Sequence, residues 1–212
     1  MTAAPAGVLV VLEGGDGAGK STQIARLVEH LGAAHPAREV VVTREPGGTP
    51  LGGRIRELLL HGDHVAPRAE ALLFAADRAH HVDSLVRPAL ERGAVVVGDR
   101  YVDSSVAYQG AGRDLDAAEV ASISRWATEG LVPHLTVLLD VDPQEGRRRR
   151  GGRDDRLEAE SAGFHTRVRE HFLALAAAAP ERYLVLDAAR PAAELAAEVA
   201  GAVDALLGGA GA

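Results

Sequence analysis

The sequence has no cysteine and almost no lysine, and each absence excludes a kind of chemistry. Without cysteine the chain can form no disulfide, thiolate zinc site, iron–sulfur cluster or cysteine nucleophile, and this is consistent with an intracellular location. Of the 23 basic residues, 22 are arginine and one, Lys20, is lysine. Lysine is therefore absent wherever only charge is needed, and its single position is the first candidate for a specific role.

Positive net charge and membrane-spanning runs are also missing. The formal net charge is −7 and the isoelectric point is about 5.7, which argues against sequence-independent binding to nucleic acid or to an anionic membrane. Residues 1–7 contain no basic segment of the kind that opens a signal peptide. No apolar run approaches the roughly 20 residues that a membrane span needs. We therefore expect a cytoplasmic protein with neither nucleic acid nor membrane as a partner.

The length and composition are those of a globular protein. With 212 residues, 47% hydrophobic and 25% charged, the chain is too apolar to be disordered and long enough to bury a core. No internal repeat or long linker is evident. We expect one domain over residues 1–212, with its core at about 8–207.

Short β-branched runs alternate with longer amphipathic segments along the chain. The short runs predict strands at 8–13, 39–43, 94–98, 135–141 and 183–186. The longer segments predict helices at 20–31, 51–60, 68–92, 117–130, 144–150, 158–178 and 191–207. This alternation is typical of an α/β fold with a five-stranded parallel sheet and helices on both faces, a three-layer sandwich. Ligands bind such sheets at the carboxyl ends of the strands, so the residues that follow each strand matter most.

A glycine-rich motif directly follows the first predicted strand. It has the pattern GxxxxGK[ST] and consists of Gly14, Gly15, Asp16, Gly17, Ala18, Gly19, Lys20, Ser21 and Thr22. In this context the backbone N–H groups and the helix N-terminus bind phosphates, Lys20 bridges the outer phosphates, and the Ser21 hydroxyl is a ligand of Mg²⁺. The motif predicts a P-loop site for a nucleoside triphosphate without deciding between a kinase, a switch and a motor.

A second group of polar residues follows the valine-rich strand. Asp99 at the tip of that strand is well placed to hold Mg²⁺ through water, or alternatively to cap the next turn. Arg100 beside it would point into the same crevice, where a second phosphate could bind. Ser105 and Gln109, four residues apart, share one face if the following segment is helical.

Four stretches together resemble one enzyme family. They are VLEGGDGAGKST, TREPGGTPLG, LLFAADRAHH and DRYVDSSVAYQG, and the likeness extends over about residues 8–207. The chain resembles the bacterial thymidylate kinases, which are P-loop nucleoside monophosphate kinases. The resemblance implies the reaction ATP + dTMP → ADP + dTDP with Mg²⁺, and a homodimer. The apolar faces of residues 68–92 and 117–130 are candidate dimer surfaces, and Trp126 on the second is expected in the core or at an interface.

The resemblance also assigns a dTMP pocket. It comprises Asp16, Glu45, Pro46, Arg56, Phe74, Arg78, Arg100, Ser105, Tyr108 and Gln109. By the resemblance, Phe74 stacks on thymine, although its spacing alone fits a core position equally well. Arg78 donates to the O4 edge and rejects an exocyclic amine there. Tyr108 lies under the sugar and favours deoxyribose, while Arg56 and Arg100 clamp the acceptor phosphate.

The remaining pocket residues have roles implied in the same way. Asp16 contacts the 3′-hydroxyl group, Ser105 and Gln109 approach the base, and Glu45 and Pro46 border the pocket. Arg44 is either a further contact or a structural residue.

An arginine-rich segment lies between two predicted helices. On composition alone residues 147–157 could be a solvated loop, but related kinases carry a mobile lid at this position. The phosphate loop itself has no basic residue at positions 15–18, so the extra cation must come from elsewhere. By the resemblance Arg153 is the lid arginine and Arg149 packs on adenine. The arginine-rich segment is about two residues shorter than in some relatives, so the assignment of these roles among Arg149, Arg150 and Arg153 stays open. Lys20, Arg100 and Arg153 are then the catalytic residues.

Two other functions remain to be weighed. A GTPase switch would need an NKxD sequence to read guanine, and Lys20 is the only lysine, so none exists. A nucleoside kinase would need a general base for a neutral hydroxyl, for which Asp16 or Glu45 could serve. The arginines assigned to an acceptor phosphate would then have no purpose. A kinase acting on another monophosphate is the remaining alternative.

Overall fold

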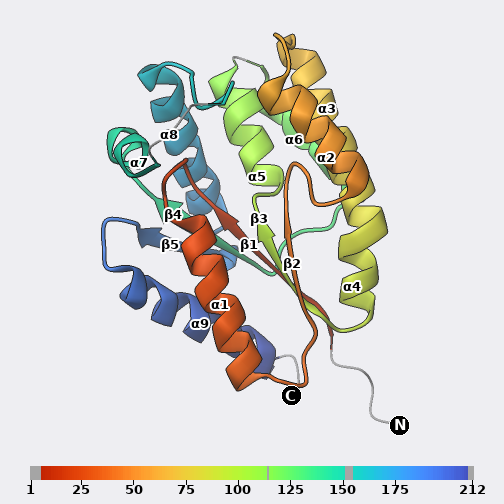
Figure 1. Cartoon of the computed structure of the whole chain (residues 1–212), viewed down its shortest axis with the longest axis vertical. Helices are drawn as coiled ribbons and strands as arrows, with labels where there is room; N and C mark the ends of the chain where they lie inside the picture. Colours follow the sequence, from red (N-terminus) through yellow and green to blue (C-terminus); the bar gives the residue numbers. More distant parts are fainter. Residues whose placement is uncertain (1–5, 114, 151–154, 210–212) are drawn as a thin grey trace.

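The computed structural model describes residues 6–113, 115–150 and 155–209. Its centre is a parallel sheet in the order β2-β3-β1-β4-β5 (Figure 1). The strands are β1 (Val8–Glu13), β2 (Val40–Arg44), β3 (Val95–Asp99), β4 (Leu135–Asp140) and β5 (Tyr183–Asp187). In the register, Leu12 of β1 faces Asp99 of β3 and Val137 of β4, so the residues after all three strands reach one edge of the sheet. The predicted five-stranded parallel sheet is confirmed.

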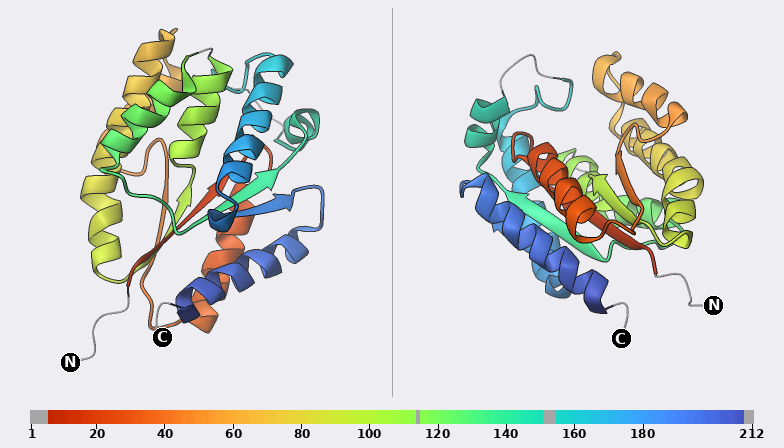
Figure 2. Two further views of the ribbon diagram at one scale, coloured as in Figure 1. Left: turned by 180° about the vertical axis from the view of Figure 1, so that it is seen from behind. Right: turned by 60° about the horizontal axis from the view of Figure 1, so that its bottom comes forward.

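Helices connect the strands and cover both faces of the sheet (Figure 2). They are α1 (Lys20–Ala34), α2 (Pro50–Arg56), α3 (Pro67–His81), α4 (Arg87–Glu91), α5 (Val102–Ser105), α6 (Ala117–Ala127), α7 (Pro143–Arg150), α8 (Ala162–Ala178) and α9 (Ala192–Gly209). Three segments have π-helical geometry, η1 (Glu57–His61), η2 (Val82–Val86) and η3 (Val106–Gly112), and η4 (Pro180–Arg182) is a short 3₁₀ turn. None of the helices among the described residues is long and apolar enough to cross a lipid bilayer.

Alternation along the buried strands creates two hydrophobic layers. Val10 and Leu12 of β1 pack with Leu27 of α1 and Val199 of α9. Leu9, on the opposite face of the same strand, packs with residues of η2 and α4. A third cluster, between α2, η1, α3, η3 and α8, includes Leu138 of β4. The five successive apolar residues Val8–Leu12 of β1 are what a strand covered on both faces requires.

Two predicted helices have different boundaries in the structure. The helix predicted at 68–92 is divided by the π-helical segment η2, and α4 begins just before Pro88, whose ring nitrogen cannot donate the usual hydrogen bond. The helix predicted at 158–178 begins only at Ala162. Its cap is Ser161, whose Oγ accepts a hydrogen bond from the N–H of Phe164 at 3.2 Å. Local polar groups thus set boundaries that hydrophobic periodicity alone does not reveal.

Trp126 does not lie in the core. Its side chain on α6 is 80% exposed, so of the two expected positions only that at an interface remains.

Candidate active site

The phosphate loop joins β1 to α1 and lies close to the backbone of neighbouring elements. Gly14 and Gly17 have φ angles of 131° and 77°, in the range that favours glycine. A Cβ atom on Gly14 would lie 2.3 Å from the Leu139 carbonyl oxygen, and one on Gly17 would lie 2.0 Å from that of Gly146. These two glycines are therefore required by the packing of the loop as well as by its curvature.

Lys20 is buried at the first position of α1. Its Nζ donates to the carbonyl oxygens of Gly14 at 2.9 Å and Gly15 at 3.1 Å, which holds the loop around the ammonium group. Burial and the neighbouring Arg100 lower the pKa of Lys20 to about 8, although Asp16 and Asp99 act in the opposite direction. A positive charge that is costly to bury would be stabilised by a bound phosphate.

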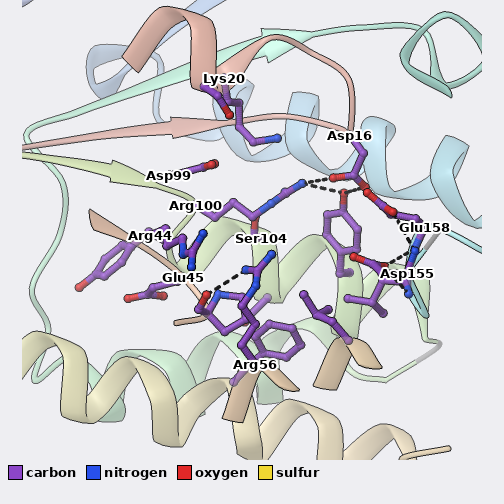
Figure 3. Close-up of a pocket in the computed structure, with 18 of the residues that line it drawn as sticks. Asp16, Lys20, Arg44, Glu45, Arg56, Asp99, Arg100, Ser104, Asp155 and Glu158 are labelled. Carbon is purple, nitrogen blue, oxygen red and sulfur yellow. Dashed lines mark hydrogen bonds and ion pairs between the residues drawn. The ribbon is translucent and has the colours of Figure 1, made fainter. Parts of the chain in front are cut away.

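Arg100 connects the phosphate loop to the segment that follows β3 (Figure 3). Its guanidinium donates to Asp16 Oδ1 at 2.5 Å, to Ser104 Oγ at 3.0 Å and to the Gly14 carbonyl at 3.2 Å. The same group lies over the ring of Tyr108, 5.1 Å from its centroid. Burial would raise the pKa of Asp16, but Arg100 and Lys20 outweigh it and lower this pKa to about 2. The ion pair is therefore fully formed at neutral pH.

The backbone of Arg100 has an unusual conformation, with a φ of 69°. Non-glycine residues are uncommon in this left-handed region, so the surroundings must hold it there. Glu13, at the end of β1, holds the backbone that follows Arg100. Its carboxylate accepts hydrogen bonds from Tyr101 N at 2.8 Å, Ser104 N at 3.2 Å and Ser104 Oγ at 2.6 Å. Burial, together with Asp103, raises the pKa of Glu13 to about 7.

The sequence analysis did not single out Glu13. The available signal was a lone carboxylate ending an otherwise apolar, fully buried strand. Such a group must be hydrogen-bonded in the folded protein, and here its partners are Tyr101 and Ser104, which follow Arg100 in the chain.

Arg78 is the centre of a second, fully buried polar network. Its guanidinium makes four hydrogen bonds: to Glu45 Oε2 at 2.7 Å, Ser124 Oγ at 3.1 Å, the Tyr101 carbonyl at 3.0 Å and Ser105 Oγ at 3.0 Å. Arginine has five N–H donors, so one is left over from these four bonds for a ligand. Residues from the segments that follow β2 and β3, from α5 and from α6 thus fix the plane of this guanidinium before any ligand binds.

His81 extends this network and was assigned no function from the sequence. Its Nδ1 lies 2.8 Å from Glu45 Oε1 and its Nε2 lies 2.6 Å from Thr43 Oγ1. Glu45 therefore contacts both Arg78 and His81, and all three side chains are almost fully buried. It orients Arg78 rather than merely bordering the pocket.

One cavity of about 650 Å³ contains both motifs at the carboxyl edge of the sheet. All ten residues predicted for the dTMP pocket line it: Asp16, Glu45, Pro46, Arg56, Phe74, Arg78, Arg100, Ser105, Tyr108 and Gln109. The loop contributes Gly17, Gly19, Lys20, Ser21 and Thr22, whereas Gly14, Gly15 and Ala18 are not among the lining residues. Arg44, Leu60, Tyr101, Ser104, Asp155, Leu157 and Glu158 also line the cavity.

Phe74 is both a cavity residue and a core residue. Its side chain is 8% exposed, lines the cavity, and packs in the cluster that includes Leu59 and Phe172. Phe74 lies in both places because the cavity wall is the surface of this cluster, and its stacking on thymine stays a prediction.

A buried carboxylate joins the arginine-rich segment to the cavity wall. Glu70 of α3 accepts a hydrogen bond from Gln109 at 3.0 Å and pairs with Arg113 at 3.2 Å and Arg156 at 2.5 Å. Arg113 also pairs with Glu160. Arg113, directly after η3, therefore contributes to the contact between η3 and the segment that precedes α8.

Arg149 and Arg150 line the cavity from the end of α7. Arg149 donates to Glu145 Oε1 at 2.7 Å and to the Ala188 carbonyl at 2.7 Å, while Arg150 pairs with Glu158 at 3.2 Å. Arg153 lies outside the described residues. The arginine-rich segment therefore reaches the cavity with at least two cations.

The residues predicted to hold Mg²⁺ fit that ion. Ser21 and Asp99 both line the cavity near Lys20, and both offer the oxygen ligands that Mg²⁺ prefers. Asp99 Oδ1 is buried and has no hydrogen-bond partner among the described residues. A buried carboxylate oxygen without a partner is unusual and is explained if a bound cation, with its water, supplies one.

Comparisons with known proteins agree with this geometry. Residues 12–199 match the family model described as thymidylate kinase. A thymidylate kinase of Clavibacter sepedonicus is 64% identical over 197 residues, covering 91% of this chain and 92% of that protein. One from Deinococcus radiodurans is 54% identical over 200 residues, covering 93% and 96%. The crystal structure of thymidylate kinase from Ehrlichia chaffeensis superposes with a TM-score of 0.79 at 30% identity, covering 94% of this chain and all of that one.

Proposed function

The chain belongs to the thymidylate kinase family, and from this premise we propose that it transfers the γ-phosphoryl group of ATP to dTMP, giving ADP and dTDP for DNA synthesis. One observation supports this above the others. Arg100 contacts Asp16 of the phosphate loop and Tyr108 of the second set of residues, so a single cavity can hold a triphosphate and an acceptor end to end.

The acceptor explains why the site is rich in arginine. A phosphate oxygen of dTMP is already ionised at neutral pH, so the reaction needs no general base. Catalysis then consists of in-line positioning and neutralisation of charge on the transferring group, with no covalent enzyme intermediate. Lys20, Arg100 and Arg153 are the proposed cations, and Arg56 and Arg100 hold the acceptor phosphate. Mg²⁺, when held by Ser21 and Asp99, would neutralise further phosphate charge.

Selection of thymine and deoxyribose is proposed for the far end of the cavity. The remaining N–H of Arg78 can donate a hydrogen bond to a carbonyl oxygen such as O4, whereas an exocyclic amine at that position would present a second donor to it. Tyr108 is held by Asp16 at 3.2 Å and packs against Phe164, so its ring cannot easily withdraw to make room for a 2′-hydroxyl group. Arg149 is the proposed adenine contact.

The test of this function is ADP release with Mg-ATP across dTMP, dUMP, dCMP, dGMP, AMP, UMP and thymidine, with a control lacking an acceptor. Rapid turnover with dTMP, weaker turnover with dUMP and negligible turnover with the others is expected. Turnover with thymidine would instead indicate a nucleoside kinase. ATP loss independent of the acceptor would show that the phosphate loop was interpreted correctly and the second site was not.

Phe74→Ala is expected to raise KM for dTMP about tenfold or more while KM for ATP changes little, because a base–aromatic stack contributes roughly 1–3 kcal/mol. Since Phe74 also packs in the core, Phe74→Leu is the matched variant, for it keeps most of the buried volume and loses only the stack. Steady-state kinetics with each substrate varied separately distinguishes the two effects. An increase confined to KM for ATP would contradict the pocket assignment.

Arg153→Ala is expected to lower kcat by roughly 10²-fold or more, the scale of losing one preorganised charge contact. Arg149→Ala and Arg150→Ala should have smaller effects on kcat if Arg153 is the lid cation. Arg148→Ala is the matched control, because among residues 6–113, 115–150 and 155–209 this exposed arginine pairs with Glu145 of the same segment and does not line the cavity. Saturating kinetics on the four variants decides the assignment, and an unchanged kcat in Arg153→Ala would refute it.

We also propose that the chain acts as one domain, in the cytoplasm, as a homodimer through α3 and α6. These two helices pack against each other, and each presents a large exposed apolar side chain, Leu72 at 57% and Trp126 at 80% exposure. Burying such side chains against a second copy would remove the largest exposed apolar group of the molecule from water.

Trp126→Ser is therefore expected to raise the dissociation constant of the dimer about tenfold or more, as for a buried aromatic at the centre of an interface. Sedimentation velocity over a range of concentrations measures this. Val185→Ser is the control, since Val185 is similarly apolar and 45% exposed but lies on β5 at the far edge of the sheet. Equal effects of the two substitutions would exclude this interface.

A further inference from the structure

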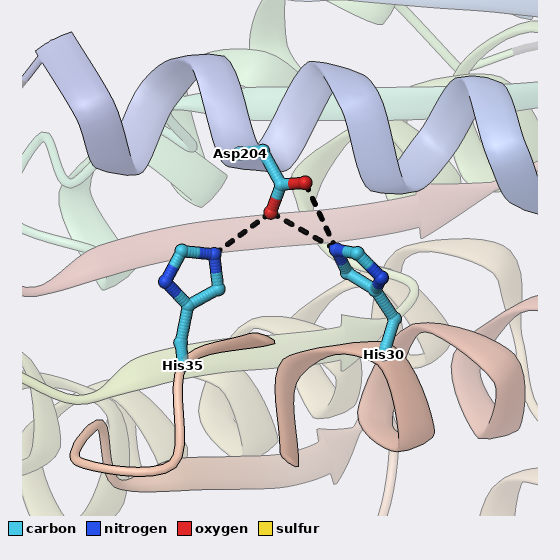
Figure 4. A group of neighbouring side chains, drawn as sticks. All are labelled: His30, His35 and Asp204. Atoms are coloured by element: carbon cyan, nitrogen blue, oxygen red, sulfur yellow. Dashed lines mark hydrogen bonds and ion pairs between the residues drawn. The ribbon is translucent and has the colours of Figure 1, made fainter. Parts of the chain in front are cut away.

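Two histidines and an aspartate form a cluster away from the cavity, where the end of α1 meets α9 (Figure 4). His30 lies on α1, His35 directly follows it, and Asp204 lies on α9. His30 Nε2 is 3.0 Å from both carboxylate oxygens of Asp204, and His35 Nε2 is 2.8 Å from Oδ1. The three side chains are 33%, 28% and 40% exposed, so an ion from solvent can reach them.

The spacing suits a tetrahedral metal ion. One ligand atom from each residue lies within 4.8 Å of the others. Zinc binds imidazole nitrogen and carboxylate oxygen at about 2.0–2.2 Å, which places neighbouring ligand atoms roughly 3.3 Å apart. The separations of 2.8 and 3.0 Å between imidazole nitrogen and carboxylate oxygen lie slightly below this value, and no pair of ligand atoms exceeds 4.8 Å, so small side-chain rotations would suffice to coordinate an ion.

We propose that His30, His35 and Asp204 form a Zn²⁺ site, completed by water, that clamps α1 to α9. Two imidazoles and one carboxylate favour zinc or a similar transition metal over Mg²⁺ and Ca²⁺, which prefer oxygen ligands. Metal binding requires neutral imidazoles with the lone pair on Nε2 and the ring proton on Nδ1.

The site would strengthen an existing contact between the two helices. Near the start of α1, Gln23 Nε2 donates to the Ala192 carbonyl at 3.0 Å, and Leu27 packs with Val199 between the two helices. The histidine–aspartate cluster holds the opposite end of the same helix pair. None of its three residues lines the cavity, so zinc is expected to change the stability of the protein and not its phosphoryl transfer.

The experiment uses the full chain, freed of metal with EDTA, dialysed, and kept in excess Mg²⁺ so that the active site does not compete. Calorimetric titration with ZnCl₂ should show one ion per chain. Zinc at a hundredfold excess over its Kd should raise Tm by about 5 °C. Co²⁺ in place of zinc should give the visible absorption of a four- or five-coordinate site. EDTA should reverse each effect.

Variants distinguish this site from other histidines. His35→Gln and Asp204→Asn should abolish the stoichiometric binding, the Tm shift and the cobalt spectrum, while keeping a hydrogen-bonding side chain. The double variant His61→Gln/His64→Gln removes two exposed histidines elsewhere and should retain all three. Absence of zinc binding in the unmodified protein, its persistence in His35→Gln and Asp204→Asn, or its loss in the double variant would each overturn the proposal. The metal-free Tm of every variant verifies that it folds.

Discussion

Arg100→Ala should lower kcat by about 10²–10³-fold, the scale seen when one preorganised charge contact to a transition state is removed. The guanidinium is held by Asp16, Ser104 and the Gly14 carbonyl, so it reaches the transferring group with little reorganisation. Arg100→Lys keeps the charge but loses the planar fork that makes these contacts together, and should fall between the wild type and Arg100→Ala. Steady-state kinetics with Mg-ATP and dTMP measures each variant.

Arg92→Ala is the control for this prediction. Arg92 is also an arginine paired with a carboxylate, Glu39, but it lies on the exposed surface far from the cavity. Its removal should leave kcat unchanged. If Arg100→Ala folded and kept the wild-type kcat, the proposal that Arg100 stabilises the transferring phosphoryl group would be wrong.

Glu45→Ala is expected to destabilise the protein by about 3–5 kcal/mol, because it leaves the buried charge of Arg78 without a counter-ion. It also removes the partner of His81, so two polar side chains lose a bond in a region closed to water. KM for dTMP should rise as well, since Glu45 orients the guanidinium proposed to read the base. Urea denaturation gives the stability and substrate titration gives KM.

Two further variants test the cause of that loss. Glu45→Gln keeps the shape and an acceptor oxygen but not the charge, so its stability should lie between those of the wild type and Glu45→Ala. Glu39→Ala breaks the exposed pair with Arg92 and should leave the urea midpoint unchanged, because water screens that pair. Equal destabilisation by Glu45→Ala and Glu39→Ala would show that burial of the ion pair has no special importance.

The sequence predicted the site well where the chemistry is carried by contiguous motifs. Asp99 ends β3, Arg100 directly follows it, and Lys20 closes the loop after β1. Parallel strands bring such positions to one edge regardless of helix boundaries. Phe74 and Arg78 reached the same cavity because their spacing in α3 puts them on one face. The π-helical segments η1, η2 and η3 were not predicted, because each is only five to seven residues long and a coarse apolar pattern does not separate an i→i+5 turn from an α-helical one.

The residues that position the site were harder to predict. Glu13, His81 and Glu70 act through partners distant in the chain: Glu13 and Ser104 are 91 residues apart, and Glu70 and Gln109 are 39 apart. No local pattern encodes such pairs. Only the general rule that a buried carboxylate must have a partner points to them, and it does not name the partner.

Because Lys20 is buried in the site and is the chain's only lysine, a reagent that acylates amines can also report on the active site. Apart from the α-amino group, the Nζ of Lys20 is the only primary amine for an acylating reagent to attack, and a pKa of about 8 leaves part of it unprotonated and nucleophilic near neutral pH. Occupancy of the phosphate loop by ATP would shield that amine. The mass of a second acyl group per chain, beyond the one on the α-amino group, would thus report the fraction of sites open to nucleotide, with no background from other lysines.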